Sequence, residues 1–180
     1  MTLRWVVILF FLDFFGWEAT MYRHPTHVFG TDIPALVAGH DRLHVVFATD
    51  KIISTALSKL DGLVDTGKPG LTIQVQNQCL EYPFRLEPPA DTPLLVVIYG
   101  GLRGFASAIE MVKKVKAHRP DSRIVVTTCF CIPENKIVMA APLLQSGVLD
   151  GMVQMKDSCN HHSFMGHIFS DLVESWPVAF

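Results

Sequence analysis

The sequence predicts an α/β fold in which helices cover both faces of a five-stranded parallel sheet. Strand-like and helix-like segments alternate five times after residue 43, which is the order typical of parallel sheets with crossover helices. Three of the strand segments are unbroken apolar runs, as strands covered on both faces require. The length of 180 residues and the 49% of hydrophobic residues favour one compact domain.

The first two units follow each other directly. Residues 45–48 are an apolar run that predicts a buried strand. The spacing of Ile53 and Leu57 then predicts a helix, and Asp50 stands where a carboxylate can cap it. Residues 71–76 alternate between apolar and polar side chains, which indicates a strand with one polar face at the edge of the sheet.

The third unit and the fourth strand are the most regular. Residues 94–98 form the strongest buried-strand pattern in the chain. Residues 107–118 carry one apolar stripe beside exposed lysines, which predicts an amphipathic helix that ends at Pro120. Residues 124–126 predict another strand covered on both faces.

The last elements complete the order. Residues 137–144 predict a helix that Pro142 must kink or bound. Residues 152–155 predict the fifth strand, and the spacing of Ile168 and Leu172 predicts a final helix. For five such units the flavodoxin-like strand order 2-1-3-4-5 is expected, with ligands beyond the carboxyl ends of the strands.

Residues 1–43 are expected to form an extension ahead of a domain spanning residues 44–180. The apolar run at residues 5–17 resembles a signal-peptide core, but Asp13 interrupts it and no small-residue cleavage site follows. It is also shorter than the roughly 20 apolar residues of a membrane-spanning helix. Three interpretations stay open: a wrongly extended start with the true one at Met21, a membrane-associating or signal-like segment, or an additional packed element.

Charge and cysteine content exclude some classes of protein. The chain has 15 basic and 17 acidic residues, so no excess of positive charge would draw it onto nucleic acid. Its 4 cysteines are too few for a disulfide framework and fit reduced thiols in the cytoplasm. A metal site of Cys129, Cys131, Cys159 and nearby histidines is not expected, because metal-ligand spacing is missing.

Four stretches of the chain share the pattern of one known family. They are Ala-Thr-Asp-Lys at 48–51, Ala-Ile-Glu-Met-Val-Lys-Lys-Val-Lys at 108–116, Arg-Pro-Asp-Ser-Arg-Ile-Val-Val-Thr-Thr at 119–128 and Leu-Asp-Gly-Met-Val at 149–153. From residue 44 to about residue 173, the chain resembles the receiver domain of two-component response regulators. The resemblance is nearest to the receivers that precede LuxR-type helix-turn-helix domains.

The resemblance implies a degenerate phosphoacceptor pocket. Working receivers carry an acidic pair after the first strand, an aspartate nucleophile after the third, a Thr or Ser after the fourth and a Lys after the fifth. These groups bind Mg²⁺ and the phosphoryl group. The corresponding positions here are Asp50, Tyr99, Thr128 and Lys156. Only Thr128 matches cleanly, since Thr49 replaces one acid, Lys156 stands one residue late, and a phenol cannot replace the carboxylate.

The glycine-rich loop after the third strand supports an alternative. Gly100, Gly101 and Gly104 could let backbone N–H groups surround a phosphate, with Arg103 as a counter-charge. The chain would then be a small nucleotide- or phosphate-binding α/β enzyme that uses the loop at residues 99–104. Glycines that only form a turn would give the same pattern.

The fourth helix, fifth strand and fifth helix are the expected contact surface, because the resemblance implies it: they commonly form the dimer face in receivers. The segment has more apolar side chains than one buried stripe requires, which favours an interface, although additional core burial would explain it equally. The expected interface residues are Ile137, Met139, Leu143, Leu144 and Met152.

The resemblance implies a non-phosphorylatable protein-interaction module, and not an enzyme, in bacterial signal transduction or transcription regulation. It would act through another regulator protein or a second copy of itself, without a cofactor or metal. No helix-turn-helix follows before Phe180, so direct binding of nucleic acid is not expected. Membrane contact is expected only if residues 1–20 are real and retained. A truncated or decayed gene product is a further alternative.

Overall fold

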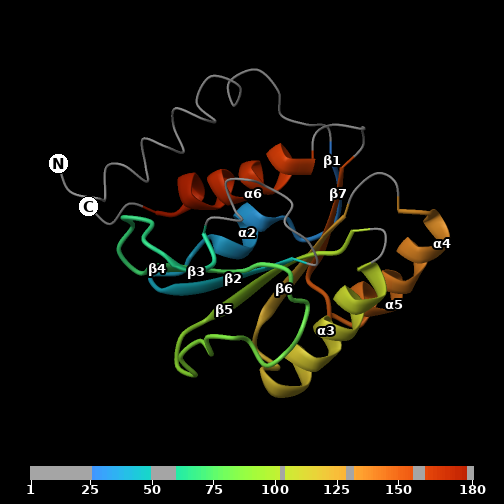
Figure 1. The fold of residues 1–180 in the computed structure, drawn as a ribbon, viewed down its shortest axis with the longest axis horizontal. Helices are drawn as coiled ribbons and strands as arrows, with labels where there is room; N and C mark the ends of the chain where they lie inside the picture. The colour runs from blue at the N-terminus through green and yellow to red at the C-terminus, as the bar shows by residue number, and fades with distance from the viewer. Residues whose placement is uncertain (1–25, 50–59, 102–103, 129–131, 156–160, 178–180) are drawn as a thin grey trace.

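The fold is built on one mixed sheet, which has seven strands among the described residues (Figure 1). The computed structural model describes residues 26–49, 60–101, 104–128, 132–155 and 161–177. From one edge to the other, the strands are β1 (Thr26–Gly30), β7 (Gly151–Met155), β6 (Arg123–Thr128), β5 (Leu94–Tyr99), β2 (Leu43–Thr49), β4 (Leu71–Gln76) and β3 (Gly62–Val64).

Five neighbouring strands in this sheet run parallel, in the order β4, β2, β5, β6 and β7. Every residue of β2 and β5 is buried, as expected for apolar strands that helices cover on both faces. In the register, Thr49 lies beside Tyr99, and Tyr99 lies beside Thr127. The carboxyl ends of β2, β5 and β6 therefore meet at one edge of the sheet.

The prediction of a five-stranded, wholly parallel, flavodoxin-like sheet is wrong, because β1 and β3 add two antiparallel strands. β1 pairs with β7, and β3 pairs with β4. Both strands are short and lie at sheet edges, where a strand does not need to be apolar on both faces. They therefore lack the long apolar run from which the central strands were predicted. β1 and the short helix α2 (Ile33–Val37) come from residues 1–43, the expected extension, and Val37 is fully buried in the core.

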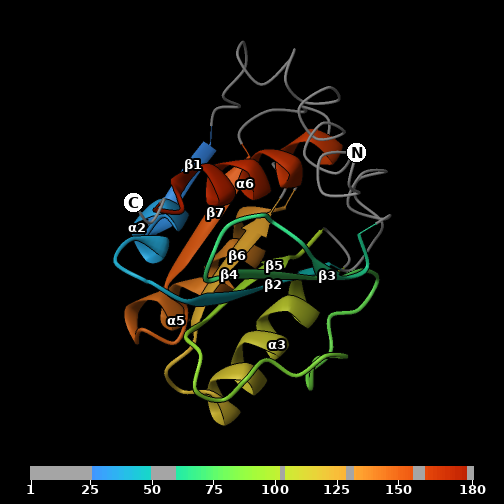
Figure 2. The same cartoon turned by 90° about the vertical axis from the view of Figure 1, so that its left-hand side faces the viewer.

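Helices cover both faces of the sheet (Figure 1 and Figure 2). One face carries α2 and α6 (His161–Ser175); the other carries α3 (Phe105–His118), α4 (Glu134–Ile137), the 3₁₀ turn η2 (Val138–Ala140) and α5 (Ala141–Gln145). Phe47 of β2 packs against Phe169 of α6, with ring centroids 5.8 Å apart. None of the helices within the described residues is both long and apolar enough to cross a membrane. The helix expected near Ile53 lies outside the described residues.

β4 is not the edge strand that its alternating pattern predicted, because β3 lies outside it. Its polar residues Gln74 and Gln76 are 1% exposed. Gln74 Oε1 lies 3.3 Å from Nε2 of His44 on β2, so the two buried polar groups satisfy each other.

The guanidinium of Arg119 donates to the carbonyls of Pro88, Pro89 and Thr92, which fastens the proline-rich connection ahead of β5.

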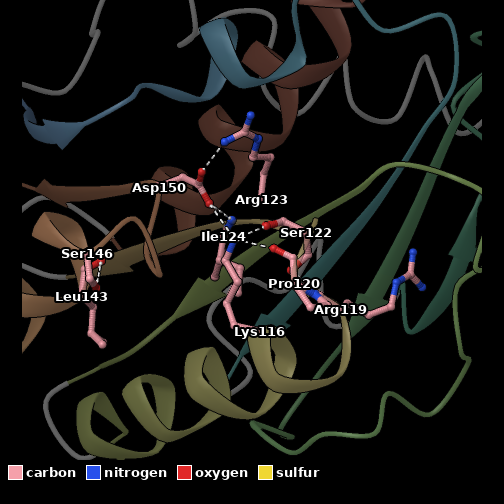
Figure 3. A network of polar contacts seen from close by, with 9 residues as sticks. All are labelled: Lys116, Arg119, Pro120, Ser122, Arg123, Ile124, Leu143, Ser146 and Asp150. Atoms are coloured by element: carbon pink, nitrogen blue, oxygen red, sulfur yellow. Dashed lines mark hydrogen bonds and ion pairs between the residues drawn. The ribbon is translucent and has the colours of Figure 1, made fainter.

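A polar network joins α3, β6 and β7 at the amino-terminal ends of the strands (Figure 3). The Asp150 side chain is 8% exposed and forms ion pairs with Arg123 at 2.8 Å and Lys116 at 3.8 Å. Its Oδ2 also accepts the backbone N–H of Ile124 at 2.8 Å. Lys116 further donates to the carbonyl of Ser122, so it is not the solvated helix residue that the sequence predicted.

Candidate functional site

The carboxyl ends of the parallel strands bring several hydroxyl-bearing residues together. Thr49 ends β2, Tyr99 ends β5, and Thr127 and Thr128 end β6. All four are buried, with between 0% and 4% of their surface exposed. Ligands of parallel α/β sheets bind at this edge, so these residues are the first to consider as a functional site.

Tyr99 and Thr128 do not face each other across this edge. Tyr99 lies beside Thr127 in the register, so strand alternation directs Thr128 to the opposite face of the sheet. Tyr99 lies on the face of Phe47, which α6 covers, and Thr128 lies on the α3 face. The structure therefore does not bring these two members of the predicted phosphoacceptor pocket together. The other two members, Asp50 and Lys156, lie outside the described residues.

The glycine-rich loop after β5 lets α3 approach the sheet closely. A Cβ atom at Gly100 would lie 3.0 Å from Cβ of Ala108, which is closer than almost all real contacts. The N–H of Gly100 donates to the carbonyl of Thr127, and the N–H of Gly104 donates to Gly101, both at 3.0 Å. The loop is thus a turn that seats α3 over β5 and β6. Its predicted counter-charge, Arg103, lies outside the described residues.

The N-terminus of α3 has no side-chain cap. Gly104 is the N-cap residue and cannot accept a hydrogen bond through a side chain, and the first turn contains no acidic residue. The first backbone N–H groups of a helix have no carbonyl partner within the helix, and the helix dipole makes this end positive. This end of α3 is therefore electropositive and rich in donors.

Thr128 is a buried polar residue whose hydroxyl is unsatisfied. Its side-chain oxygen is the one buried side-chain N or O atom in the described part of the chain without a hydrogen-bond partner. The neighbouring Thr127 is equally buried, but its hydroxyl donates to the carbonyl of Ile98 at 3.4 Å. Leaving a buried hydroxyl unpaired costs about 1–3 kcal/mol, so this oxygen needs a structural or functional explanation.

The connection after β4 forms a second polar cluster, which the sequence did not predict. Both guanidinium nitrogens of Arg85 lie 2.7 Å from the carboxylate oxygens of Asp61. Gln76 accepts the N–H of Arg85, and the N–H of Cys79 donates to the carbonyl of Thr49 at 2.8 Å. The cluster holds this connection against the carboxyl ends of β4 and β2. Arg85 and Asp61 are 24 residues apart, and Cys79 and Thr49 are still further apart, so no local motif indicates the cluster.

The expected interface residues range from exposed to fully buried. Met139 is 47% exposed, and Met152 is 1% exposed. Met152 is core because β1 covers the edge of β7, which the prediction left open. Ile137, Leu143 and Leu144 are partly buried against the core. Val138, which was not selected from the sequence, is the most exposed large apolar residue among those described, at 65%.

No metal or cofactor site is evident in the part of the chain that the structure describes. Within it, no three His, Cys, Asp or Glu side chains lie close enough to hold a metal ion. Cys129, Cys131 and Cys159 fall outside the described residues. Comparisons with protein-family models, curated proteins and solved structures found no match to the chain.

Proposed function

We propose that the chain is a protein-interaction domain without phosphotransfer activity, acting through a partner regulator in the bacterial cytoplasm. The observation that carries the proposal is the exposure of two large apolar side chains on η2. Val138 is 65% exposed and Met139 is 47% exposed. An apolar cluster of this kind on a small domain marks a contact surface more often than bare surface.

The apolar surface extends from η2 toward the edge of the sheet. Leu144 of α5 reaches within 3.2 Å of the position that a Cβ would take at Gly30, the last residue of β1. On β1, Phe29 is 40% exposed and lies on the same face of the sheet as its register partner Met152, whereas Val28 points to the opposite face. We call Phe29, Val138, Met139 and Leu144 the apolar surface. A methionine in such a surface adapts its shape to a partner.

The ends of β2 and β5 support the absence of phosphotransfer. Phosphoryl transfer through Mg²⁺ needs carboxylate ligands and an anionic acceptor. Thr49 and Tyr99 at these positions are neutral and almost fully buried. A phenol with an ordinary pKa of about 10 is not an anion at neutral pH.

The cellular setting in this proposal comes from the resemblance to receivers of LuxR-type regulators. The net charge of −2 favours a protein partner over nucleic acid. The scarcity of cysteine favours the cytoplasm. We take the partner to be a second regulator protein. The alternative, in which the chain associates with a second copy of itself, is tested by the same experiment.

The experiment compares two substitutions to glutamate. Met139→Glu alters the apolar surface, and Leu86→Glu places the same charge on another exposed apolar residue, outside that surface, at 46% exposure. Sedimentation of the purified chain measures self-association, and quantitative affinity capture from the native cell measures the partner. We expect Met139→Glu to lose the associated protein and Leu86→Glu to retain it, with melting temperatures within a few degrees. Retention by Met139→Glu would contradict the proposal.

A further inference from the structure

The N-terminus of α3 lies over the carboxyl ends of β5 and β6. Helix α3 follows β5 through the turn at Gly101 and Gly104, and its first turn packs on Gly100. Phe105, Ala106 and Ser107 are its first residues, and neither a side-chain cap nor an acidic residue neutralises their backbone N–H groups. A helix end of this kind attracts anions, but alone it does not define a site.

The hydroxyl of Thr128 is a second and independent indication of a ligand. Tyr99 and Thr127 are register partners, so Gly100 and Thr128 are the next residues along the two neighbouring strands and lie on the same face. The missing Cβ of Gly100 would point at Ala108 and Phe105 of α3. Thr128 therefore projects toward the first turn of α3. Its side chain is 0% exposed and, within the described residues, unpartnered.

We propose that a phosphate group binds between the N-terminus of α3 and Thr128. The backbone N–H groups of the first helical turn and the hydroxyl of Thr128 would donate hydrogen bonds to its oxygens. A phosphate fits because it offers several acceptor oxygens and negative charge at a site that supplies donors and a positive dipole. The group is either inorganic phosphate or the phosphate of a small phosphomonoester. This site goes beyond the proposed interaction function and does not depend on it.

The experiment is a titration of the ¹⁵N-labelled full chain, followed by the amide resonances of residues 104–107. One arm uses inorganic phosphate, a second uses adenosine 5′-monophosphate, and sodium chloride at the same ionic strength is the control. We expect saturable shifts with phosphate and none with chloride. Tighter binding of the nucleotide would assign a phosphomonoester, and equal binding would assign the free anion. Absence of saturable shifts in both arms would overturn the proposal.

Two threonine variants test the assigned hydroxyl. Thr128→Val keeps the shape of the side chain and removes the hydroxyl, so we expect phosphate affinity to fall roughly tenfold. Thr127→Val removes the neighbouring buried hydroxyl, which already bonds to Ile98, and we expect phosphate affinity to stay unchanged. Equal affinity of wild type and Thr128→Val would overturn the role of this residue.

A surface variant keeps the proposal testable if a core threonine variant fails to fold. Ser107 is exposed in the first turn of α3. Ser107→Asp places a negative charge there, so we expect phosphate affinity to fall at least tenfold. Ser107→Asn has nearly the same size as Ser107→Asp but no charge, so we expect it to bind phosphate at least several-fold more tightly than Ser107→Asp does. Unchanged affinity of Ser107→Asp would show that the anion binds elsewhere.

Discussion

Lys116 and Asp150 form a largely buried ion pair between the end of α3 and the start of β7. The Lys116 nitrogen lies 3.8 Å from Oδ2 of Asp150, and the two side chains are 15% and 8% exposed. The same carboxylate accepts the N–H of Ile124 and contacts Arg123 (Figure 3). Asp150 thus joins the start of β7 to the end of α3 and the start of β6, which are both distant from it in the sequence.

Asp150→Asn should destabilise the fold by about 2–4 kcal/mol, because it leaves the buried ammonium of Lys116 without its counter-charge. Chemical denaturation at neutral pH measures the loss. Glu110→Gln is the control, since the ion pair of Glu110 with Lys113 is exposed and its removal should leave the unfolding midpoint unchanged. Equal midpoints for Asp150→Asn and wild type would contradict the prediction.

The chain should lose stability as pH falls below about 6.5 because of His44. Burial lowers the pKa of His44 below its ordinary value of 6.5, the bond to Gln74 opposes this effect, and Arg119 adds to it. The unfolded chain therefore binds a proton at His44 more readily than the folded chain does. Stability is full above pH 6.5 and falls as pH descends toward the lower folded pKa.

The variant His44→Gln isolates this effect, because it removes the titrating group and can still hydrogen-bond to Gln74. The free energy of unfolding should fall more steeply for wild type than for His44→Gln between pH 6.5 and pH 5. Parallel curves would mean that His44 does not contribute to acid sensitivity.

Gly70→Ala should destabilise the fold at least twice as much as Gly39→Ala. Both glycines have positive φ, +78° at Gly70 and +83° at Gly39, so both substitutions strain the backbone by roughly 1–2 kcal/mol. A Cβ at Gly70 would also collide with the carbonyl oxygen of Asp41, whereas a Cβ at Gly39 meets no atom within 4 Å. Thermal unfolding measures the loss of stability in each variant, and the additional loss in Gly70→Ala reports the collision, because both variants share the backbone strain. Equal losses would mean that backbone shifts relieve the contact.

Arg85→Lys should loosen the connection after β4 without much loss of global stability. A lysine cannot reproduce the two parallel bonds to Asp61, but the pair is 46% and 45% exposed, so the global change should stay below about 1 kcal/mol. Hydrogen exchange at the Cys79 amide, which donates to Thr49, should become several-fold faster. Unchanged exchange would show that other contacts hold the connection.

The same cluster should weaken in acid. Burial acts to raise the pKa of Asp61, but the N–H of Asn77 and the guanidinium of Arg85 outweigh burial and hold this pKa below 3.8. A carboxylate with a lowered folded pKa stabilises the fold above its unfolded pKa and loses this effect as pH falls further. Protection of the Cys79 amide in wild type should therefore decline below about pH 4, and a flat profile would contradict this assignment.

The central strands could be predicted from sequence, whereas the edge strands could not. β2 and β5 are buried over their whole length, and this burial is what an apolar run reports. β3 has only three residues and begins at Gly62, and β1 has two exposed apolar side chains, Val28 and Phe29. Neither strand is long enough, or apolar enough on one face, to show a hydrophobic pattern that sequence reasoning can detect. Missing β1 also caused Met152 to be expected at the surface.

At the candidate site, residue identity was easier to predict than side-chain direction. Thr128 was selected because it follows a strand, and the structure places it at that strand end. The pairing of Tyr99 with Thr127 depends on the register between strands, and a shift of one residue would reverse which threonine faces α3. Lys116 was expected to be solvated because its partner Asp150 is 34 positions away in the numbering.

The pairing of β1 with β7 has a consequence for biosynthesis. Gly30 leaves the ribosome well before its partner Gly151, and the other five strands of the described sheet are made in between. At roughly 5–20 residues per second, β1 must wait on the order of ten seconds for its neighbour. During that interval Val28 and Phe29 are available to chaperones or to other nascent chains. When the chain is overproduced in cells with little chaperone capacity, we therefore expect β1 to make wrong contacts before any other part of the fold does.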